Sequence, residues 1–168
     1  MRLLKSSAAL FFLAIMSLNL NAQQIDADIT ITRVVESSAD DVWAVLRQLD
    51  NIDDLTNVVS SVEFTGNYGA GGTRICHTAD GQGYFKESIL TLNDSERTYT
   101  YALLEGAPVQ GMVNHFKVVD LGYLKSMIVW TSSYESFMSN PQMTEEQFLG
   151  FINQTASEMI GNVALVAQ

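Results

Sequence analysis

Residues 144–166 read TEEQFLGFINQTASEMIGNVALV, and this stretch decides the fold of the chain. Mostly apolar side chains recur along it at the spacing of one helix face, at Phe148, Phe151, Ile152, Thr155, Met159, Ile160 and Val163. Thr144 and Gln147 form a capping-box pattern, and the two acidic residues between them favour a first helical turn. A helix from there to about Val166 spans roughly 33 Å, so its apolar stripe needs a whole sheet to cover it.

The residues before this helix favour strands joined by short turns. Alternating and β-branched residues predict strands over 62–64, 73–78, 84–92, 97–105, 112–120 and 124–136. Short connections indicate antiparallel neighbours, because parallel strands need a long crossover between them.

The segment ahead of these strands predicts one more strand and two short helices. Residues 25–35 alternate between apolar and polar side chains, which indicates a strand. Ser38 offers an N-cap to a short amphipathic helix that continues to about Leu49, and 52–59 favours a further helical turn or two. The sequence therefore predicts an α+β protein in which about seven antiparallel strands form a curved sheet wrapped around one long C-terminal helix.

The N-terminal residues have the layout of a secretory signal. Two positive charges precede an apolar run over 8–18, and Ala22 stands before a polar residue. The run is shorter than the roughly 20 residues that span a bilayer. We expect 1–22 to be a signal peptide cleaved after Ala22, with an uncleaved anchor as the alternative. Residues 23–168 then form one domain that is secreted or periplasmic.

The charge of the chain limits its partners. Cleavage removes Arg2 and Lys5, two of the nine basic residues and none of the 19 acidic ones, so the net charge falls from −10 to −12. This charge repels phosphate backbones and anionic lipid surfaces, so we expect no nucleic-acid partner and no stable membrane insertion after cleavage. Cys76 is the only cysteine, so no disulfide can form within the chain and the fold depends on its core.

Several motifs occur in an order that resembles a known superfamily. Residues 38–46 read SADDVWAVL, residues 62–74 run from VEF to GGTR, and the segments ESIL, RTYTY and VW follow at 87, 97 and 129. Together they resemble the START-like, or SRPBCC, superfamily, whose helix-grip fold is shared by the birch-pollen allergen and bacterial polyketide cyclase/dehydrase-like proteins. The resemblance covers essentially the whole mature chain. Ile52–Leu55 departs from it, because the family often has Trp-x-Pro after the first helix.

The resemblance implies a cavity between the curved sheet and the long helix. The glycine-rich loop 66–72 borders the mouth of that cavity in the family, as a flexible gate or as a plain hairpin. The leading hypothesis is binding of a small hydrophobic molecule, such as a lipid, a sterol or a polyketide, without a cofactor. The alternatives are a cyclase- or dehydratase-like enzyme that uses the same cavity, and a protein-interaction module with a filled core.

Strand alternation and the helix stripe supply candidates for the wall of the cavity. These residues mix apolar side chains with hydroxyl and amide groups, a mixture that ligand pockets need and dry cores avoid. For any one of them, an ordinary place in the core is the alternative. The candidate ligand-binding residues are Tyr99, Tyr101, Leu103, Asn114, Phe116, Trp130, Ser132, Tyr134, Phe148, Phe151, Ile152, Thr155 and Met159.

Arg74 and Glu87 lie on adjacent predicted strands, either as an exposed pair on the outer face or pointing inward. If both point inward, Glu87 becomes the best candidate for a general base and Arg74 an anchor for a carboxylate or enolate. Tyr101 completes the candidate catalytic set. Cys76 and His77 are consecutive on a strand and should face opposite sides, so we expect no metal site.

Overall fold

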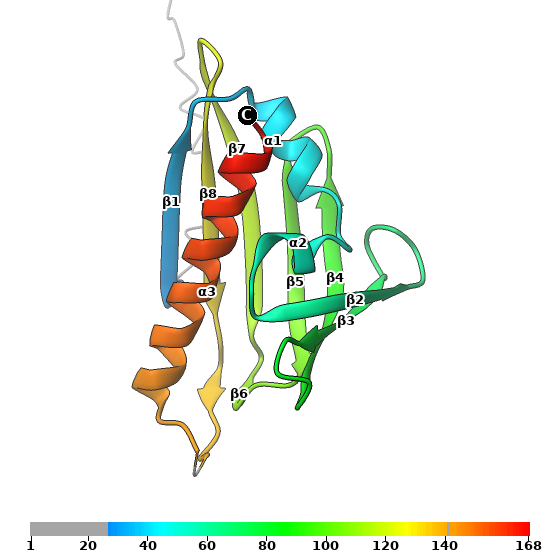
Figure 1. The fold of residues 1–168 in the computed structure, drawn as a ribbon, viewed down its shortest axis with the longest axis vertical. Coiled ribbons are helices and arrows are strands. Elements are labelled where there is room, and N and C mark those ends of the chain that lie inside the picture. The colour runs from blue at the N-terminus through cyan, green and yellow to red at the C-terminus, as the bar shows by residue number, and fades with distance from the viewer. Residues whose placement is uncertain (1–26, 141) are drawn as a thin grey trace, which may run out of the picture.

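The structure is a computed structural model that describes residues 27–140 and 142–168 (Figure 1). The expected signal peptide, residues 1–22, and the start of the first predicted strand lie outside these described residues. Within them, no helix combines the length and the apolar character that a bilayer crossing requires.

Seven strands form one antiparallel sheet in the order β1-β8-β7-β5-β4-β3-β2. Their bounds are β1 (Ile29–Val35), β2 (Val59–Thr65), β3 (Thr73–Thr78), β4 (Tyr84–Asn93), β5 (Thr98–Glu105), β7 (Val113–Gly122) and β8 (Lys125–Ser133). Two further strands, β6 (Val109–Gln110) and β9 (Ser136–Phe137), pair only with each other. The helices are α1 (Ala39–Leu46), α2 (Ile52–Leu55) and α3 (Glu145–Val166). The predicted helix-grip class is therefore confirmed.

Local signals set the ends of the helices. The Ser38 hydroxyl accepts a hydrogen bond from the Asp41 amide and starts α1. Thr144 and Gln147 form a complete capping box and start α3. The last predicted strand is interrupted before β9, because the Tyr134 amide donates to the Asp28 carboxylate at 2.9 Å instead of continuing the ladder.

The sheet curves around α3, which lies along its concave face, while α1 and α2 cover the neighbouring part of that face (Figure 1). Register shifts interrupt the β4–β5 pairing at Lys86/Glu87 and at Ile89/Thr91. Such bulges bend a strand and increase its twist. In Figure 1, β2 and β3 accordingly run across the direction of the other strands. The concave face therefore has walls on several sides of α3.

The two edges of the sheet are strands that lie close together in the sequence. β1 pairs along its whole length with β8, from Ile29 opposite Ser132 to Val35 opposite Ser126. β2 forms the other edge and pairs with β3. The hydrophobic core lies between the sheet and the helices and is continuous from α1 to α3, where Ile160 and Val163 are fully buried.

Candidate functional site

A cavity lies between the concave face of the sheet and α3. The space that the centre of a water molecule can occupy within it amounts to about 100 Å³. Its wall is mainly apolar, and several side chains bring charge or hydrogen-bonding groups to it, among them Arg74, Glu87, Tyr101, Asn114 and Thr155. The cavity thus combines apolar surface with a few polar groups, as ligand sites do.

Eight of the predicted wall residues line this cavity. They come from three strands of the sheet and from α3, and they are Tyr101, Leu103, Asn114, Trp130, Phe151, Ile152, Thr155 and Met159. The three candidate catalytic residues, Arg74, Glu87 and Tyr101, line it as well. The structure therefore brings the candidate catalytic residues and these eight wall residues to one place.

The other five predicted wall residues do not line the cavity. Tyr99 and Phe116 stack on each other in the core with ring centroids 5.1 Å apart. Ser132 is buried away from the cavity wall. Tyr134 and Phe148 pack edge to face near the start of α3. Strand alternation and the helix stripe predicted which face these residues share, but not their position along the strand or helix relative to the cavity.

Sequence reasoning missed a second group of wall residues. Some belong to α2 and the segment after it, where the pattern predicted helical turns. The others lie on or next to strands, or in α3. The group is Ile52, Thr56, Val58, Val59, Cys76, Phe85, Ala107, Met112 and Ala156. Cys76 and Phe85 share the inward face with Arg74 and Glu87, so alternation could have identified them. No sequence signal places α2 over the cavity.

Arg74 and Glu87 form a buried ion pair in this wall. They lie directly opposite each other on β3 and β4, and Arg74 Nε donates to Glu87 Oε2 at 2.5 Å. Their side chains are 2% and 13% exposed, so both point inward and the exposed outer pair is ruled out. Arg74 Nη1 also donates to the Leu49 carbonyl oxygen at 2.9 Å, and the guanidinium lies 4.8 Å from the centre of the Tyr101 ring.

The electrostatics of the pair keep Arg74 charged. Burial lowers the pKa of Arg74, whereas the Glu87 carboxylate raises it, and the net shift of this pKa is upward. Burial and then Glu87 likewise raise the pKa of Cys76, to about 12. Tyr101 is shifted in the same direction, because burial and Glu87 raise its pKa well above its ordinary value. The cavity therefore holds one ion pair, a thiol and a protonated phenol.

Two polar side chains face the cavity beside this pair. The Tyr101 hydroxyl accepts a long hydrogen bond of 3.4 Å from Trp130 Nε1. Asn114 is 2% exposed, and its Oδ1 has no hydrogen-bond partner among residues 27–140 and 142–168. In that same part of the chain, no three His, Cys, Asp or Glu side chains are grouped as metal ligands would be.

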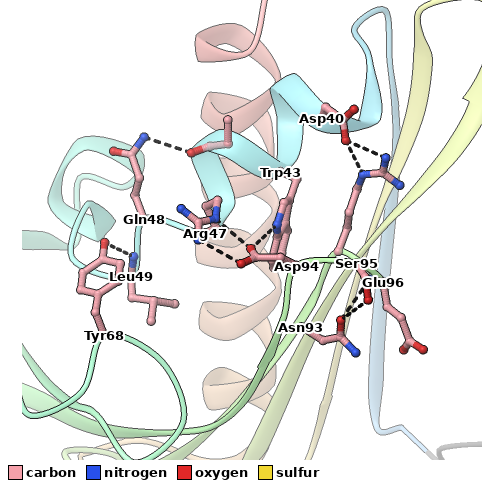
Figure 2. A network of polar contacts seen from close by, with 12 residues as sticks. Asp40, Trp43, Arg47, Gln48, Leu49, Tyr68, Asn93, Asp94, Ser95 and Glu96 are labelled. Carbon is pink, nitrogen blue, oxygen red and sulfur yellow. Dashed lines mark hydrogen bonds and ion pairs between the residues drawn. The ribbon is translucent and has the colours of Figure 1, made fainter.

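The glycine-rich loop 66–72 contributes no residue to the cavity wall. A Cβ atom at Gly72 would lie 2.2 Å from the Asn67 carbonyl oxygen, so this tight connection requires glycine. Tyr68 instead packs the loop against the turn after α1, beside a network in which Asp94 accepts hydrogen bonds from Trp43 and Arg47 (Figure 2). This geometry supports the plain-hairpin interpretation of the loop.

Comparisons with known proteins agree with this architecture. Residues 26–159 match the family model described as "Polyketide cyclase / dehydrase and lipid transport". A search of curated proteins found no match. An aromatase/cyclase from Streptomyces is similar with a TM-score of 0.71 and 20% identity, over 83% of this chain and 92% of that chain.

Two other solved structures show the same likeness. An uncharacterised protein from Bacillus thuringiensis has a TM-score of 0.71 and 18% identity, over 83% of this chain and 97% of that chain. Norcoclaurine synthase from Thalictrum flavum, in complex with dopamine and hydroxybenzaldehyde, has a TM-score of 0.66 and 20% identity, over 82% of this chain and 84% of that chain. At these identities the likeness concerns the fold. Together with the family model, it confirms the resemblance drawn from the sequence: the chain belongs to the polyketide cyclase / dehydrase and lipid transport family.

Proposed function

We propose that this protein binds a compact hydrophobic molecule in the cavity between the sheet and α3. One observation carries the proposal: the side chains of Arg74, Glu87, Tyr101 and Asn114 line a space with mainly apolar walls, and Asn114 Oδ1 has no hydrogen-bond partner within the described residues. A filled core would leave the Asn114 oxygen unsatisfied at a cost in stability. A ligand supplies both the apolar contacts and the missing polar partners.

The size of the cavity favours a molecule of one or two rings over a long acyl chain or a sterol. About 100 Å³ is open to the centre of a water molecule, which is little space for an extended guest. Apolar burial contributes roughly 25 cal/mol per Å², so a compact molecule still gains useful affinity. The single-ring compounds in the norcoclaurine synthase complex, dopamine and hydroxybenzaldehyde, suit a cavity of this kind.

Binding can be tested with the uncharged two-ring fluorescent probe 6-propionyl-2-(dimethylamino)naphthalene. We expect its emission to rise and shift to the blue on addition of the protein, with saturation at one probe per chain. Thr155→Phe adds a ring to the cavity wall from α3 and should weaken binding at least about tenfold, since the ring occupies the space of the probe. Gln154→Phe, on the exposed face of the same helix, is the matched control and should bind as the wild type does.

The outcomes of this titration separate the possible failures. A wild-type protein that leaves the probe emission unchanged would contradict ligand binding. Equal binding by the Thr155→Phe and Gln154→Phe variants would place the probe outside the cavity. Circular dichroism of both variants establishes that they are folded before the comparison is made.

A second candidate function is acid–base chemistry in the same cavity, as in a cyclase or dehydratase. The observation that favours it is the arrangement of Glu87, Tyr101 and Arg74 in one wall. Glu87 would remove a proton from a carbon next to a carbonyl group, and the protonated Tyr101 would donate a hydrogen bond to the resulting enolate oxygen.

This chemistry can be measured with 2-tetralone, a compact two-ring ketone, in D₂O. Catalysed exchange of the hydrogens next to its carbonyl group would appear in NMR spectra as a loss of proton signal faster than in buffer. Glu87→Gln should abolish the acceleration, while Glu105→Gln, which removes an exposed carboxylate, should retain it. If the wild-type protein left the exchange of these hydrogens at the buffer rate, the result would contradict acid–base catalysis. It would not affect the proposal of ligand binding.

We also propose that the protein acts outside the cytoplasm, after cleavage of residues 1–22. The proposal rests on the charged start, the apolar run and Ala22 described above. Expression of the full chain in a bacterium, followed by fractionation and N-terminal sequencing, should yield a periplasmic product that begins at Gln23. A product in the cytoplasm that begins at Met1 would contradict the proposal.

A further inference from the structure

We infer that the ligand is an uncharged molecule with a hydroxyl group, such as a phenol or an alcohol, and that the cavity discriminates against carboxylates. This inference rests on the proposed function and adds to it the chemical class of the ligand. It comes from the charges and hydrogen bonds of the cavity wall.

The charge of the cavity wall is balanced before any ligand enters. Among the lining residues of the described chain, Arg74 is the only cationic side chain and Glu87 the only anionic one. The guanidinium already donates to Glu87 Oε2 and to the Leu49 carbonyl oxygen. A ligand carboxylate would therefore meet a cation that has its counter-ion, and it would lie near a second carboxylate. Buried like charges repel strongly, so an anionic ligand is disfavoured.

The hydrogen-bonding groups of the wall that lack a partner can accept from the ligand and donate to it. Within the described residues, Glu87 accepts its hydrogen bonds at Oε2. Its other oxygen, Oε1, accepts none. Asn114 Oδ1 is a second acceptor without a partner. The Tyr101 hydroxyl accepts from Trp130 and retains its own proton to donate. A hydroxyl group both donates and accepts, whereas a carboxylate only accepts.

Three matched naphthalene compounds test the inference by isothermal titration calorimetry at neutral pH. They share one ring system and differ in a single group: 2-naphthol has a hydroxyl, 2-methylnaphthalene a methyl and 2-naphthoate a carboxylate. We expect 2-naphthol to bind about tenfold more tightly than 2-methylnaphthalene, because its hydroxyl satisfies buried acceptors. We expect 2-naphthoate to bind at least about tenfold more weakly than 2-naphthol.

A variant should change this ranking in a defined direction. Glu87→Gln removes the negative charge and leaves the Arg74 cation without its counter-ion. Its affinity for 2-naphthoate should rise at least about tenfold relative to that for 2-naphthol, because the cavity then carries a net positive charge. Glu105→Gln removes an exposed carboxylate that pairs with Lys86 and should keep the wild-type ranking.

Each outcome has a distinct meaning. Binding of 2-naphthoate as tight as that of 2-naphthol would overturn the inference and leave the proposed function intact. Equal affinities for 2-naphthol and 2-methylnaphthalene would also overturn it. Failure of all three compounds to bind would contradict the proposed function itself. The wild-type ranking alone decides these cases, so the test holds even if Glu87→Gln does not fold.

Discussion

The Tyr68 hydroxyl accepts a hydrogen bond of 2.8 Å from the backbone amide of Leu49, as Figure 2 shows. It donates in turn to Asp50 Oδ1 at 2.6 Å. The carbonyl group of the same Leu49 accepts from Arg74, so the loop that carries Tyr68 helps to fix the backbone that holds the guanidinium of the cavity. The glycine-rich loop thus supports the site without lining it.

Removal of this hydroxyl should lower the stability of the protein. In Tyr68→Phe the Leu49 amide loses its acceptor, so we expect the free energy of unfolding to fall by about 1 kcal/mol. The midpoint of urea unfolding, followed by fluorescence, measures the loss. Tyr123→Phe is the matched control, because Tyr123 is 99% exposed. Equal midpoints for the two variants would show that the Tyr68 hydroxyl does not stabilise the turn.

The buried ion pair predicts non-additive effects of substitution. Arg74→Leu leaves the Glu87 carboxylate, which is 13% exposed, without its cation, and should lower the free energy of unfolding by about 3 kcal/mol. The double variant Arg74→Leu/Glu87→Leu removes both charges and should be more stable than Arg74→Leu alone.

Urea unfolding of the single and double variants measures this coupling. Lys125→Leu breaks the exposed pair with Glu36 and serves as the control, with an expected change below about 1 kcal/mol. A double variant with the summed losses of its two single variants would refute coupling between Arg74 and Glu87.

Stability in acid should depend on Asp94. Its hydrogen bond from Arg47, and then that from Trp43, hold the pKa of Asp94 below its ordinary value. Because the folded-state pKa is the lower one, this contribution is present above the unfolded-state pKa and is lost as the pH falls through the folded-state value. The difference in urea midpoint between wild type and Asp94→Asn should therefore shrink as the pH falls from about 5 to about 2.

An exposed carboxylate without hydrogen bonds in the described chain serves as the control for Asp94. Asp54→Asn removes an exposed carboxylate of α2 that makes no side-chain hydrogen bond within the described residues. At neutral pH, the urea midpoint of Asp54→Asn should differ less from that of the wild type than the midpoint of Asp94→Asn does. A midpoint difference for Asp94→Asn that persists unchanged at the acid end of the series would refute the prediction.

Cys76 should resist thiol reagents while the protein is folded. Burial, followed by the Glu87 carboxylate, raises the pKa of this thiol to about 12, so the reactive thiolate is scarce at mildly alkaline pH. We expect 5,5′-dithiobis(2-nitrobenzoate) to react with the native protein at least about a hundredfold more slowly than with the protein in urea. Similar rates in the two states would mean that the cavity opens readily to solvent.

The secondary structure was predictable because its signals are local. The capping box of Thr144 and Gln147 and the N-cap at Ser38 each fix a helix end through neighbouring residues. Alternation identified the strands for the same reason. The short strand β6 was missed, since two residues are too few to show a pattern, and Ser136 of β9 was expected to continue the strand before it.

The cavity was predictable only in part, because its position depends on packing between distant elements. Tyr99 and Tyr101 share one face of β5, but only Tyr101 lines the cavity. Tyr99 packs in the core against Phe116. The sequence around Glu87 did indicate that its side chain points inward. Phe85 and Ile89 share its side of β4, and both are apolar and at least partly buried, whereas Lys86 on the other side is charged.

The pairing of β1 with β8 has a consequence for the order in which the protein can fold. β1 is an edge strand, so within the described sheet its one neighbour is a strand that the ribosome makes after all the other strands of that sheet. The nascent N-terminal segment must wait unpaired until residues 125–133 emerge, and such distant pairing is slow to form. Truncation at the C-terminus before β8 would therefore leave the first strand without its template, even though every residue of that strand remained.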